Sequence, residues 1–238
     1  MLEAYVVVDL EMTGLRAKTD KILEIGAVKV EKHQVTDIYQ KMINPGIKIP
    51  EDVQKLTGIT DEMVAAGVPE QEAVEGFFDF CGELPLVGHN ILFDYSFLKQ
   101  YAVNHKMTFE KNGVDTLKLS RKFFPDLEKK TLDYLCEHLN IERSHNHRAL
   151  EDAKATGVLL EYLWENYGQQ KPEAFRPVQL VYRAKKQSPA TERQKRYLKE
   201  LAEYHKISLD IDVEGLTKSE ASRRTDQILA QYGKMPRN

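Results

Sequence analysis

The chain has 238 residues, of which 42% are hydrophobic and 30% charged, and its net charge is −3. This length suits one catalytic domain with a sizeable core plus an appendage. Two widely separated cysteines, Cys81 and Cys136, exclude a disulfide framework and indicate reduced thiols. No leader-like segment and no apolar run as long as a membrane span is present, so we expect a cytoplasmic protein with no membrane contact.

The first predicted element is a buried strand over residues 4 to 10, and two acids, Asp9 and Glu11, stand at its end. Residues i and i+2 of a strand share a face, so the two carboxylates project side by side. Burying two like charges is costly unless cations neutralise them, and oxygen ligands suit Mg²⁺ or Mn²⁺. The alternative is a strand that runs into solvent with two exposed acids.

Further elements follow along the chain. We expect strands over residues 22 to 32 and 34 to 43, paired as a hairpin, and short strands near 85 to 88 and 112 to 115. Helical periodicity covers residues 69 to 81, 93 to 105, 115 to 123, 131 to 139 and 148 to 167. The pattern predicts an α/β fold with a mixed sheet flanked by helices.

Two of these helices begin with further candidate site residues. Asp94 lies at a predicted strand-to-helix junction, where open α/β sheets place their sites, although it could also be a helix cap. Asp152 lies in the first turns of the 148 to 167 helix. Helical residues five apart differ by roughly 140°, so His147 should precede that helix or open it, on a mobile segment.

The chain resembles the DEDD exonuclease superfamily, in its histidine-containing DEDDh branch, through three motifs in this order: Asp9 with Glu11, then Asp94, then His147 with Asp152. This branch includes the proofreading exonucleases of bacterial DNA polymerase III. The resemblance covers about residues 4 to 167, with weaker marks at residues 13 to 15, 56 to 60 and 114 to 117. It implies a ribonuclease H-like fold. Met12 departs from the family pattern, but its strand parity directs it away from the acids.

The resemblance also implies the chemistry. Two Mg²⁺ or Mn²⁺ ions would flank the scissile phosphate, with Asp9 bridging both ions. Glu11 and Asp152 would hold the ion that activates the attacking water, and Asp94 would bind the other ion mainly through water. His147 would be the general base, because an imidazole with an ordinary pKa of ~6.5 accepts a proton at neutral pH. His145 is the alternative base, but only His147 has the family's separation from Asp152.

Candidate substrate contacts come from two segments. Thr13 and Gly14 resemble the family's contact with the terminal nucleotide, or simply end the strand in a turn. Leu15 and Phe93 would pack on the last base or belong to the core. Asn90 is a candidate for orienting a ligand.

After residue 167 the periodicity fades in a proline-containing linker, residues 168 to 190, with a short strand expected near Val178 to Tyr182. Capping-box sequences at Thr191 and Thr217 then open two amphipathic stretches. We expect three units: an exonuclease domain (1–167), the linker, and a small C-terminal helical hairpin module (191–238) of unknown role.

The C-terminal part is basic. Residues 176 to 238 carry 14 Lys and Arg against 8 Asp and Glu, whereas residues 1 to 175 carry 20 against 29. A basic cluster contributes most of this excess: Arg183, Lys185, Lys186, Arg193, Lys195, Arg196 and Lys199. The cluster either binds phosphates or forms a solvated linker and helix face.

Together these features predict a metal-dependent 3′-to-5′ exonuclease that releases nucleoside 5′-monophosphates from single-stranded or frayed DNA in proofreading or repair. The partner would be a single-stranded DNA 3′ end, with a DNA polymerase as a candidate protein partner. Trimming of RNA 3′ ends is the alternative activity. A nucleic-acid-binding module without activity is the alternative from another class.

Overall fold

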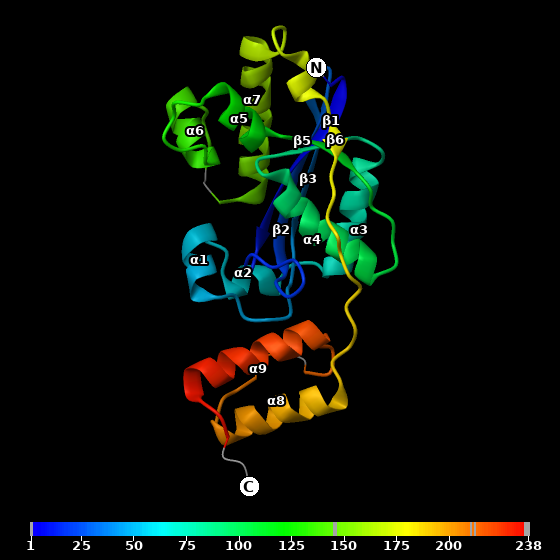
Figure 1. Ribbon diagram of the computed structural model, residues 1–238, viewed down its shortest axis with the longest axis vertical. Helices are drawn as coiled ribbons and strands as arrows, with labels where there is room; N and C mark the ends of the chain where they lie inside the picture. The colour runs from blue at the N-terminus through cyan, green and yellow to red at the C-terminus, as the bar shows by residue number, and fades with distance from the viewer. Residues whose placement is uncertain (1, 145–146, 210, 212, 236–238) are drawn as a thin grey trace.

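The computed structural model describes residues 2–144, 147–209, 211 and 213–235. A six-stranded mixed sheet in the order β3-β2-β1-β4-β5-β6 forms its centre, with helices on both faces (Figure 1). β1 pairs antiparallel with β2 and parallel with β4, and β5 extends the parallel part. The predicted mixed α/β fold is confirmed, in its ribonuclease H-like form.

The sequence predicts most elements of the first 167 residues to within a few residues. The strands are β1 (Ala4–Met12), β2 (Ile22–Glu31), β3 (Gln34–Met42), β4 (Leu86–Gly88) and β5 (Asn112–Asp115). The predicted helices are α3 (Glu70–Cys81), α4 (Ile91–Asn104), α5 (Thr116–Phe123), α6 (Leu132–Leu139) and α7 (Ala149–Tyr167). Two short helices were missed, α1 (Glu51–Thr57) and α2 (Asp61–Ala65).

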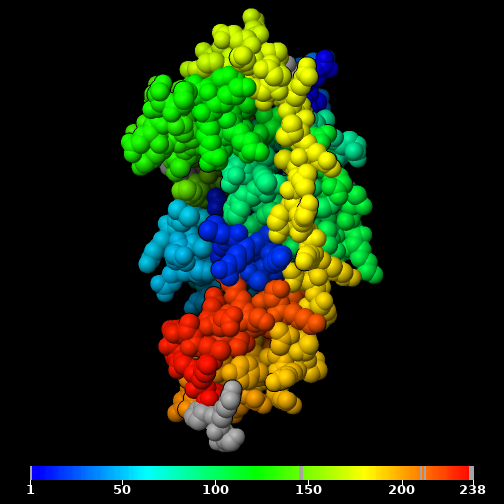
Figure 2. Space-filling view, viewed as in Figure 1, coloured from blue at the N-terminus to red at the C-terminus, as the bar shows by residue number. Residues whose placement is uncertain are grey.

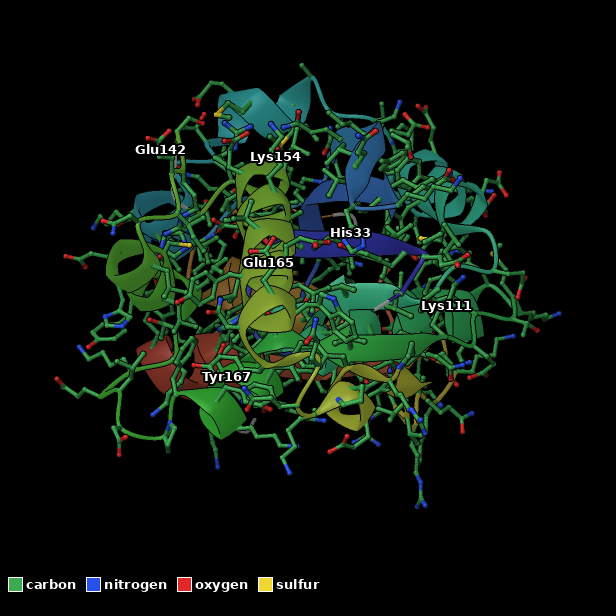
Figure 3. The ribbon with its side chains drawn as sticks, turned by 90° about the horizontal axis from the view of Figure 1, so that it is seen from above. His33, Lys111, Glu142, Lys154, Glu165 and Tyr167 are labelled. Carbon is green, nitrogen blue, oxygen red and sulfur yellow. The ribbon has the colours of Figure 1, made fainter. Side chains whose placement is uncertain are left out.

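Alternation along β1 decides where the acids lie. Val6, Val8 and Leu10 pack in the core under α3 and α4, whereas Tyr5 and Val7 pack under α5, α6 and α7. Asp9 and Glu11 continue the second series, so they lie on the α7 face of the sheet. Figure 3, viewed along the long axis, shows α7 lying on this face, with Lys154 and Glu165 marking its course.

The C-terminal part adds one strand to the sheet and then forms a pair of helices. After the 3-10 turn η1 (Pro172–Phe175), β6 (Val178–Gln179) adds a short antiparallel edge to β5. The helices α8 (Glu192–Tyr204) and α9 (Lys218–Tyr232) then pair around their own apolar cluster, which includes Leu198, Leu201 and Ile228. Both predicted capping boxes are present, at Thr191 and Thr217.

Cys81 and Cys136 are both buried free thiols. Within the ranges that the structure describes, no helix combines the length and the apolar character that a membrane span requires.

Candidate active site

Two carboxylates come from β1. Asp9 lies opposite Gly26 and Glu11 lies opposite Glu24 in the β1–β2 register. Burial, followed by repulsion from Asp94, raises the pKa of Asp9 well above its ordinary value. Burial and repulsion from Asp152 raise the pKa of Glu11 to about 8. Several carboxylates therefore lie close together in a buried environment at the end of β1.

Asp94 joins this pair from the first turn of α4, as its predicted place after β4 requires. Its Oδ1 accepts a hydrogen bond of 3.1 Å from the backbone N–H of Leu10, so the side chain is fixed against β1 between the two acids. Asp94 is buried. Burial raises its pKa to about 7 although backbone hydrogen bonds oppose the shift.

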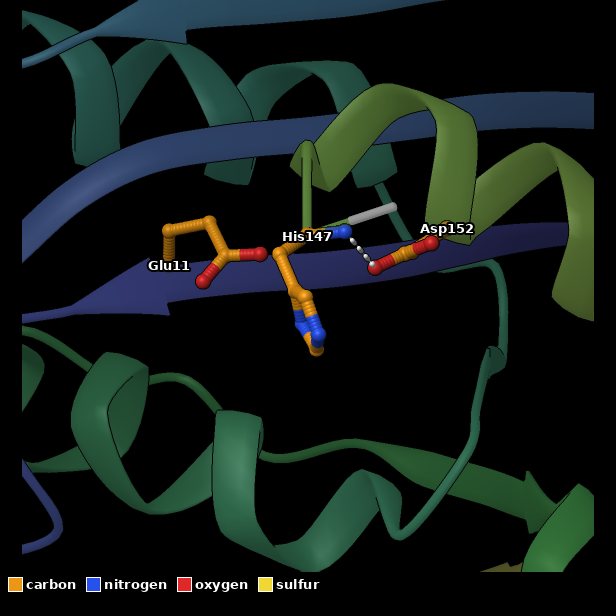
Figure 4. Close-up of side chains that lie close together, drawn as sticks. All are labelled: Glu11, His147 and Asp152. Carbon is orange, nitrogen blue, oxygen red and sulfur yellow. Dashed lines mark hydrogen bonds between the residues drawn. The ribbon is translucent and has the colours of Figure 1, made fainter. Parts of the chain in front are cut away.

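The third group comes from the start of α7. His147 lies two residues before α7, with a positive φ of 55°, and its backbone N–H donates to Asp152 Oδ2 over 3.1 Å. One ligand atom each from Glu11, His147 and Asp152 lies within 4.8 Å of the other two (Figure 4). The structure thus brings the five predicted catalytic residues together from three elements. His145, the alternative base, lies outside the described residues.

Sequence reasoning missed a buried cation in this site. Arg143, in the loop before His147, donates from Nη1 to Asp152 Oδ1 and from Nη2 to Asp133 Oδ1, each over 2.5 Å. The Arg143 side chain is almost fully buried. Burial still raises the pKa of Asp152, but Arg143 opposes that shift. The site therefore contains one carboxylate that is paired with an arginine, beside three for which no ion pair is found among the residues that the structure describes.

A second missed contact holds the start of α7 on the sheet. Arg148 donates to Glu24 from Nε and Nη2, each over 3.0 Å, and the N–H of Ala149 donates to Glu24 Oε2 over 3.2 Å. A Cβ on Gly26 would lie 2.0 Å from the backbone nitrogen of Leu150, so only glycine permits this close approach. Because α7 begins here, these contacts also fix where His147 and Asp152 lie.

The predicted substrate contacts lie around the carboxylates. Thr13, Gly14 and Leu15 follow Glu11 directly, and the Leu15 side chain is 81% exposed. Asn90 caps α4 in a left-handed conformation and donates its N–H to Asp115 Oδ1 over 3.0 Å. Phe93 is half-buried against the core and meets Phe97 edge to face. An exposed leucine has no packing role, which favours ligand contact for Leu15 over a core role.

The basic cluster divides into two parts. On α8, Lys195 pairs with Glu192 and Glu214, Lys199 pairs with Glu214, and Arg196 lies 3.7 Å from Glu200. Glu214 approaches from the loop between α8 and α9, so it could not be recognised as a partner from local sequence. The other members are Arg183, Lys185, Lys186 and Arg193, for which no ion pair is found among the described residues. This pairing favours a solvated surface for the α8 part.

The donor set fits hard divalent cations. Asp9, Glu11, Asp94 and Asp152 supply carboxylate oxygens, the ligands that Mg²⁺ and Mn²⁺ prefer. Burial raises the pKa values of Asp9, Glu11 and Asp94, and repulsion from neighbouring carboxylates adds to the shift; a divalent cation would favour the ionised forms. The site is therefore able to hold metal ions.

A mixed sheet with converging carboxylates at the end of its central strand defines a phosphodiester-hydrolase type of site. The model of the exonuclease family RNase T matches residues 6–160, so the chain belongs to this exonuclease family. The predicted class of enzyme, a 3′-to-5′ exonuclease, is confirmed.

Two curated relatives illustrate the similarity. Over 169 residues the chain is 36% identical to the DNA polymerase III subunit epsilon of Aquifex aeolicus (strain VF5), covering 69% of this chain and 84% of the relative. Over 160 residues it is 38% identical to the PolC-type DNA polymerase III of Clostridium perfringens. That match covers 67% of this chain but only 11% of the polymerase, so the chain spans about a tenth of the PolC-type relatives.

Solved structures share the fold. The nuclease domain of 3′hExo, a DEDDh family member bound to rAMP, superposes with a TM-score of 0.61 at 18% identity, covering 75% of this chain and 98% of that domain. Exonuclease X in complex with 5′ overhanging duplex DNA gives a TM-score of 0.56 at 24% identity, covering 69% and 93%. These likenesses support the fold.

Proposed function

We propose that Asp9, Glu11, Asp94 and Asp152 hold two divalent ions, Mg²⁺ or Mn²⁺, and that these four residues with His147 are the catalytic set. The convergence of four buried or half-buried carboxylates with raised pKa values carries the proposal. When bound, the ions would polarise the scissile phosphate and stabilise charge on the attacking and leaving oxygens. Asp9, which has Asp94, Glu11 and Asp152 as carboxylate neighbours, would hold these ions together with them.

His147 has the position of a general base. Its imidazole lies beside Glu11 and Asp152, and its Nε2 lies 3.7 Å from Asp133 Oδ2. A carboxylate next to an imidazole orients the ring and stabilises the imidazolium that forms when the ring takes a proton from the attacking water. We therefore propose that the Asp133 carboxylate acts on His147 through its charge, because 3.7 Å is an ion-pair distance and too long for a hydrogen bond.

The proposed substrate is the 3′ end of single-stranded or frayed DNA, with nucleoside 5′-monophosphates as products. Relatives named as subunits or forms of DNA polymerase III support DNA and a role in proofreading or repair. A polymerase is accordingly the proposed protein partner. Thr13, Gly14, Leu15, Asn90 and Phe93 would receive the terminal nucleotide, with Leu15 against its base. The exonuclease domain would comprise residues 1–167.

One assay tests both the reaction and the sugar preference. Single-stranded DNA and RNA of the same sequence, each labelled at either the 3′ or the 5′ end, would be digested with Mg²⁺ or Mn²⁺. We expect immediate release of the 3′ label and stepwise shortening of 5′-labelled DNA, with RNA cleaved more slowly. Asp9→Asn provides the control for contaminating nuclease. Faster cleavage of RNA would contradict the proposed substrate.

A further inference from the structure

The C-terminal helices lie directly against the segment that follows the catalytic strand. In the space-filling view, the orange-red helix α9 contacts the blue N-terminal segment (Figure 2). This segment, which we call the 13–21 loop (residues 13 to 21), starts two residues after Glu11 and carries three of the proposed substrate contacts. What α9 does to this loop therefore bears on the reaction.

The first contact centres on Asp20. Its side chain is only 4% exposed, and its Oδ1 forms an ion pair with Nη1 of Arg223 from α9. The same guanidinium nitrogen donates to Thr19 Oγ1 over 2.7 Å. Within the loop, Asp20 Oδ2 accepts the backbone N–H of Arg16 over 2.8 Å. Asp20 thus joins the loop's own backbone to α9.

Gly14 packs on the same carboxylate. A Cβ at this position would lie 2.6 Å from Asp20 Oδ2, so the Gly14 backbone occupies the space that any side chain would need. The position of Gly14, a proposed contact of the terminal nucleotide, consequently depends on where the Asp20 side chain is held.

A second contact acts through Lys21. Its Nζ lies 2.7 Å from Glu220 Oε1 of α9, in an ion pair that is largely shielded from solvent on the Glu220 side. The Lys21 backbone and Thr13 exchange two hydrogen bonds of 2.9 Å, one to Thr13 Oγ1 and one from the Thr13 N–H. Glu220 is thereby connected through one residue to Thr13.

Between the loop and α9 lies a cavity of about 860 Å³. One wall carries the proposed substrate contacts, another carries polar side chains of α9, and Pro50, Asp52 and Val53 at the start of α1 complete the lining. The wall residues on the two sides are Thr13, Gly14 and Leu15 on the loop, and Ser222, Arg223 and Gln227 on α9. The polar α9 wall therefore stands next to the site proposed for the terminal nucleotides.

We infer that the C-terminal helical module holds the 13–21 loop in the conformation that receives the 3′ end of the substrate, with Arg223 and Glu220 as its positioning residues. This inference rests on the proposed function and gives the module a role within it. Loss of Arg223 would leave Asp20 buried without its cation, which favours a rearranged loop. Substrate binding should suffer more than turnover, because the carboxylates lie on β1, α4 and α7.

Amide hydrogen exchange of the full chain tests the inference independently of activity. In Arg223→Gln we expect exchange over residues 13 to 21 to become about tenfold faster, the change expected when a charged hydrogen bond is lost. Exchange in β1 should stay unchanged, which verifies the fold. Arg223→Lys keeps a cation near Asp20, so its exchange rate over residues 13 to 21 should lie between those of Arg223→Gln and the unmodified chain. Glu220→Gln should also make exchange of this loop faster.

Arg224→Gln is the matched control, since it removes the same charge from the neighbouring position. No ion pair of Arg224 is found among the described residues. On single-stranded DNA, Arg223→Gln should raise KM about tenfold with kcat changed much less, whereas Arg224→Gln should alter neither loop exchange nor KM appreciably.

Three results would overturn the inference. Unchanged loop exchange in Arg223→Gln would show that α9 does not hold the loop. Faster exchange with unchanged KM would show that the loop's conformation does not matter for substrate. Equal increases of KM in both arginine variants would indicate a general charge effect. If the unmodified chain cleaved no nucleic acid, the proposed function would fail, and the exchange experiment would still decide whether α9 holds the loop.

Discussion

Two glutamates face each other across β1 and β2, and their surroundings differ. Glu24 is fully buried and accepts hydrogen bonds from Arg148, from the Ala149 N–H and from Gln40 Nε2. Glu11, its register partner, has none of these contacts, and burial with repulsion from Asp152 raises its pKa to about 8. Burial of a carboxylate thus does not identify a metal ligand. A hydrogen-bonded cation, Arg148, is what distinguishes Glu24 from Glu11.

The surroundings of Glu24 and Glu11 also suit them to different roles, one structural and one in ligand binding. Glu24 and Gly26 hold the start of α7 against the sheet, where Asp152 can reach the carboxylates of β1. Burial and neighbouring carboxylates raise the pKa values of Asp9 and Glu11, and divalent ions would favour the ionised form of both. The β2 residues thus hold the site together, whereas the β1 carboxylates are available to bind ligands. Substitutions on the two sides should therefore separate stability from activity.

The largest expected effect is a loss of activity when a β1 carboxylate is changed. Asp9→Asn should reduce turnover about a thousandfold or more, because it removes the central electrostatic contact to the ions. Stability without metal should stay equal or increase, since the change relieves repulsion among the carboxylates. Turnover of an oligonucleotide and thermal unfolding in a chelator measure the two quantities. Full activity of Asp9→Asn would refute the site assignment.

Replacing the base should have the next largest effect. His147→Ala should lower kcat about a hundredfold or more, the usual contribution of a general base, with little change in metal affinity. His145→Ala is the control, because it removes an imidazole two residues away. Inactivity of His145→Ala with an active His147→Ala would reverse the assignment.

At the other glutamate of this pair, Glu24→Gln should act mainly on stability. It removes the charge from a fully satisfied buried network, so we expect the free energy of unfolding to fall by about 2 kcal/mol. Glu11→Gln is the matched control, which should not lower stability without metal. Urea titrations of both variants in a chelator compare them. Equal destabilisation by the two changes would remove the distinction drawn between the two glutamates.

Only part of this difference between Glu11 and Glu24 can be predicted from the sequence. Strand alternation places Asp9 and Glu11 on one face, and helix periodicity places Asp152, because both patterns are local. The cation of Glu24 is Arg148, and the two lie 124 positions apart in the chain. Arg143 lies closer in sequence to Asp152, but its direction depends on how the loop folds. Ion pairing across such separations is set by tertiary packing, which local patterns do not encode.

The same limit explains the other misses. α1 and α2 are short, seven and five residues respectively, and such helices show too few turns for periodicity to reveal them. The C-terminal helices were predicted from their capping boxes, but not their contact with the 13–21 loop. That contact joins Asp20 to Arg223, 203 positions later.

Stability should depend on pH in a direction set by the unpaired carboxylates. The pKa of Glu11 rises from 4.5 to about 8 and that of Asp94 from 3.8 to about 7. The folded chain therefore holds these protons more tightly than the unfolded chain, so their stabilisation is complete below pH 4 and is lost as pH rises through these raised values. Without divalent ions, the melting temperature should fall between pH 5 and 8.

Glu11→Gln should flatten this decline, and Mg²⁺ or Mn²⁺ should oppose it, because bound cations favour the ionised carboxylates. Thermal melts at several pH values, with and without the ion, measure both effects. A melting temperature that rises from pH 5 to 8 in the chelator would contradict the charge distribution proposed for β1 and α4.

The smallest expected effect concerns the basic cluster, where internal pairing again separates two groups. Lys195 and Lys199 share Glu214, so neutralising both on α8 should leave DNA affinity almost unchanged. Arg183, Lys185 and Lys186 lie in the linker, and we expect them to be the members that contact phosphate. The test is a triple change of these residues to Gln. It keeps β6 and the C-terminal helices in place, whereas truncation after Tyr167 would remove them.

Each phosphate contact on a single strand contributes about 0.7 to the slope of log affinity against log salt concentration. Three lost contacts should therefore flatten the slope by roughly 2. Binding of one oligonucleotide by catalytically inactive Asp9→Asn protein, over a series of salt concentrations, gives the slope for each variant. If the linker variant kept the original slope, the cluster would be a solvated surface in both of its parts, because neither group would then release counterions on binding.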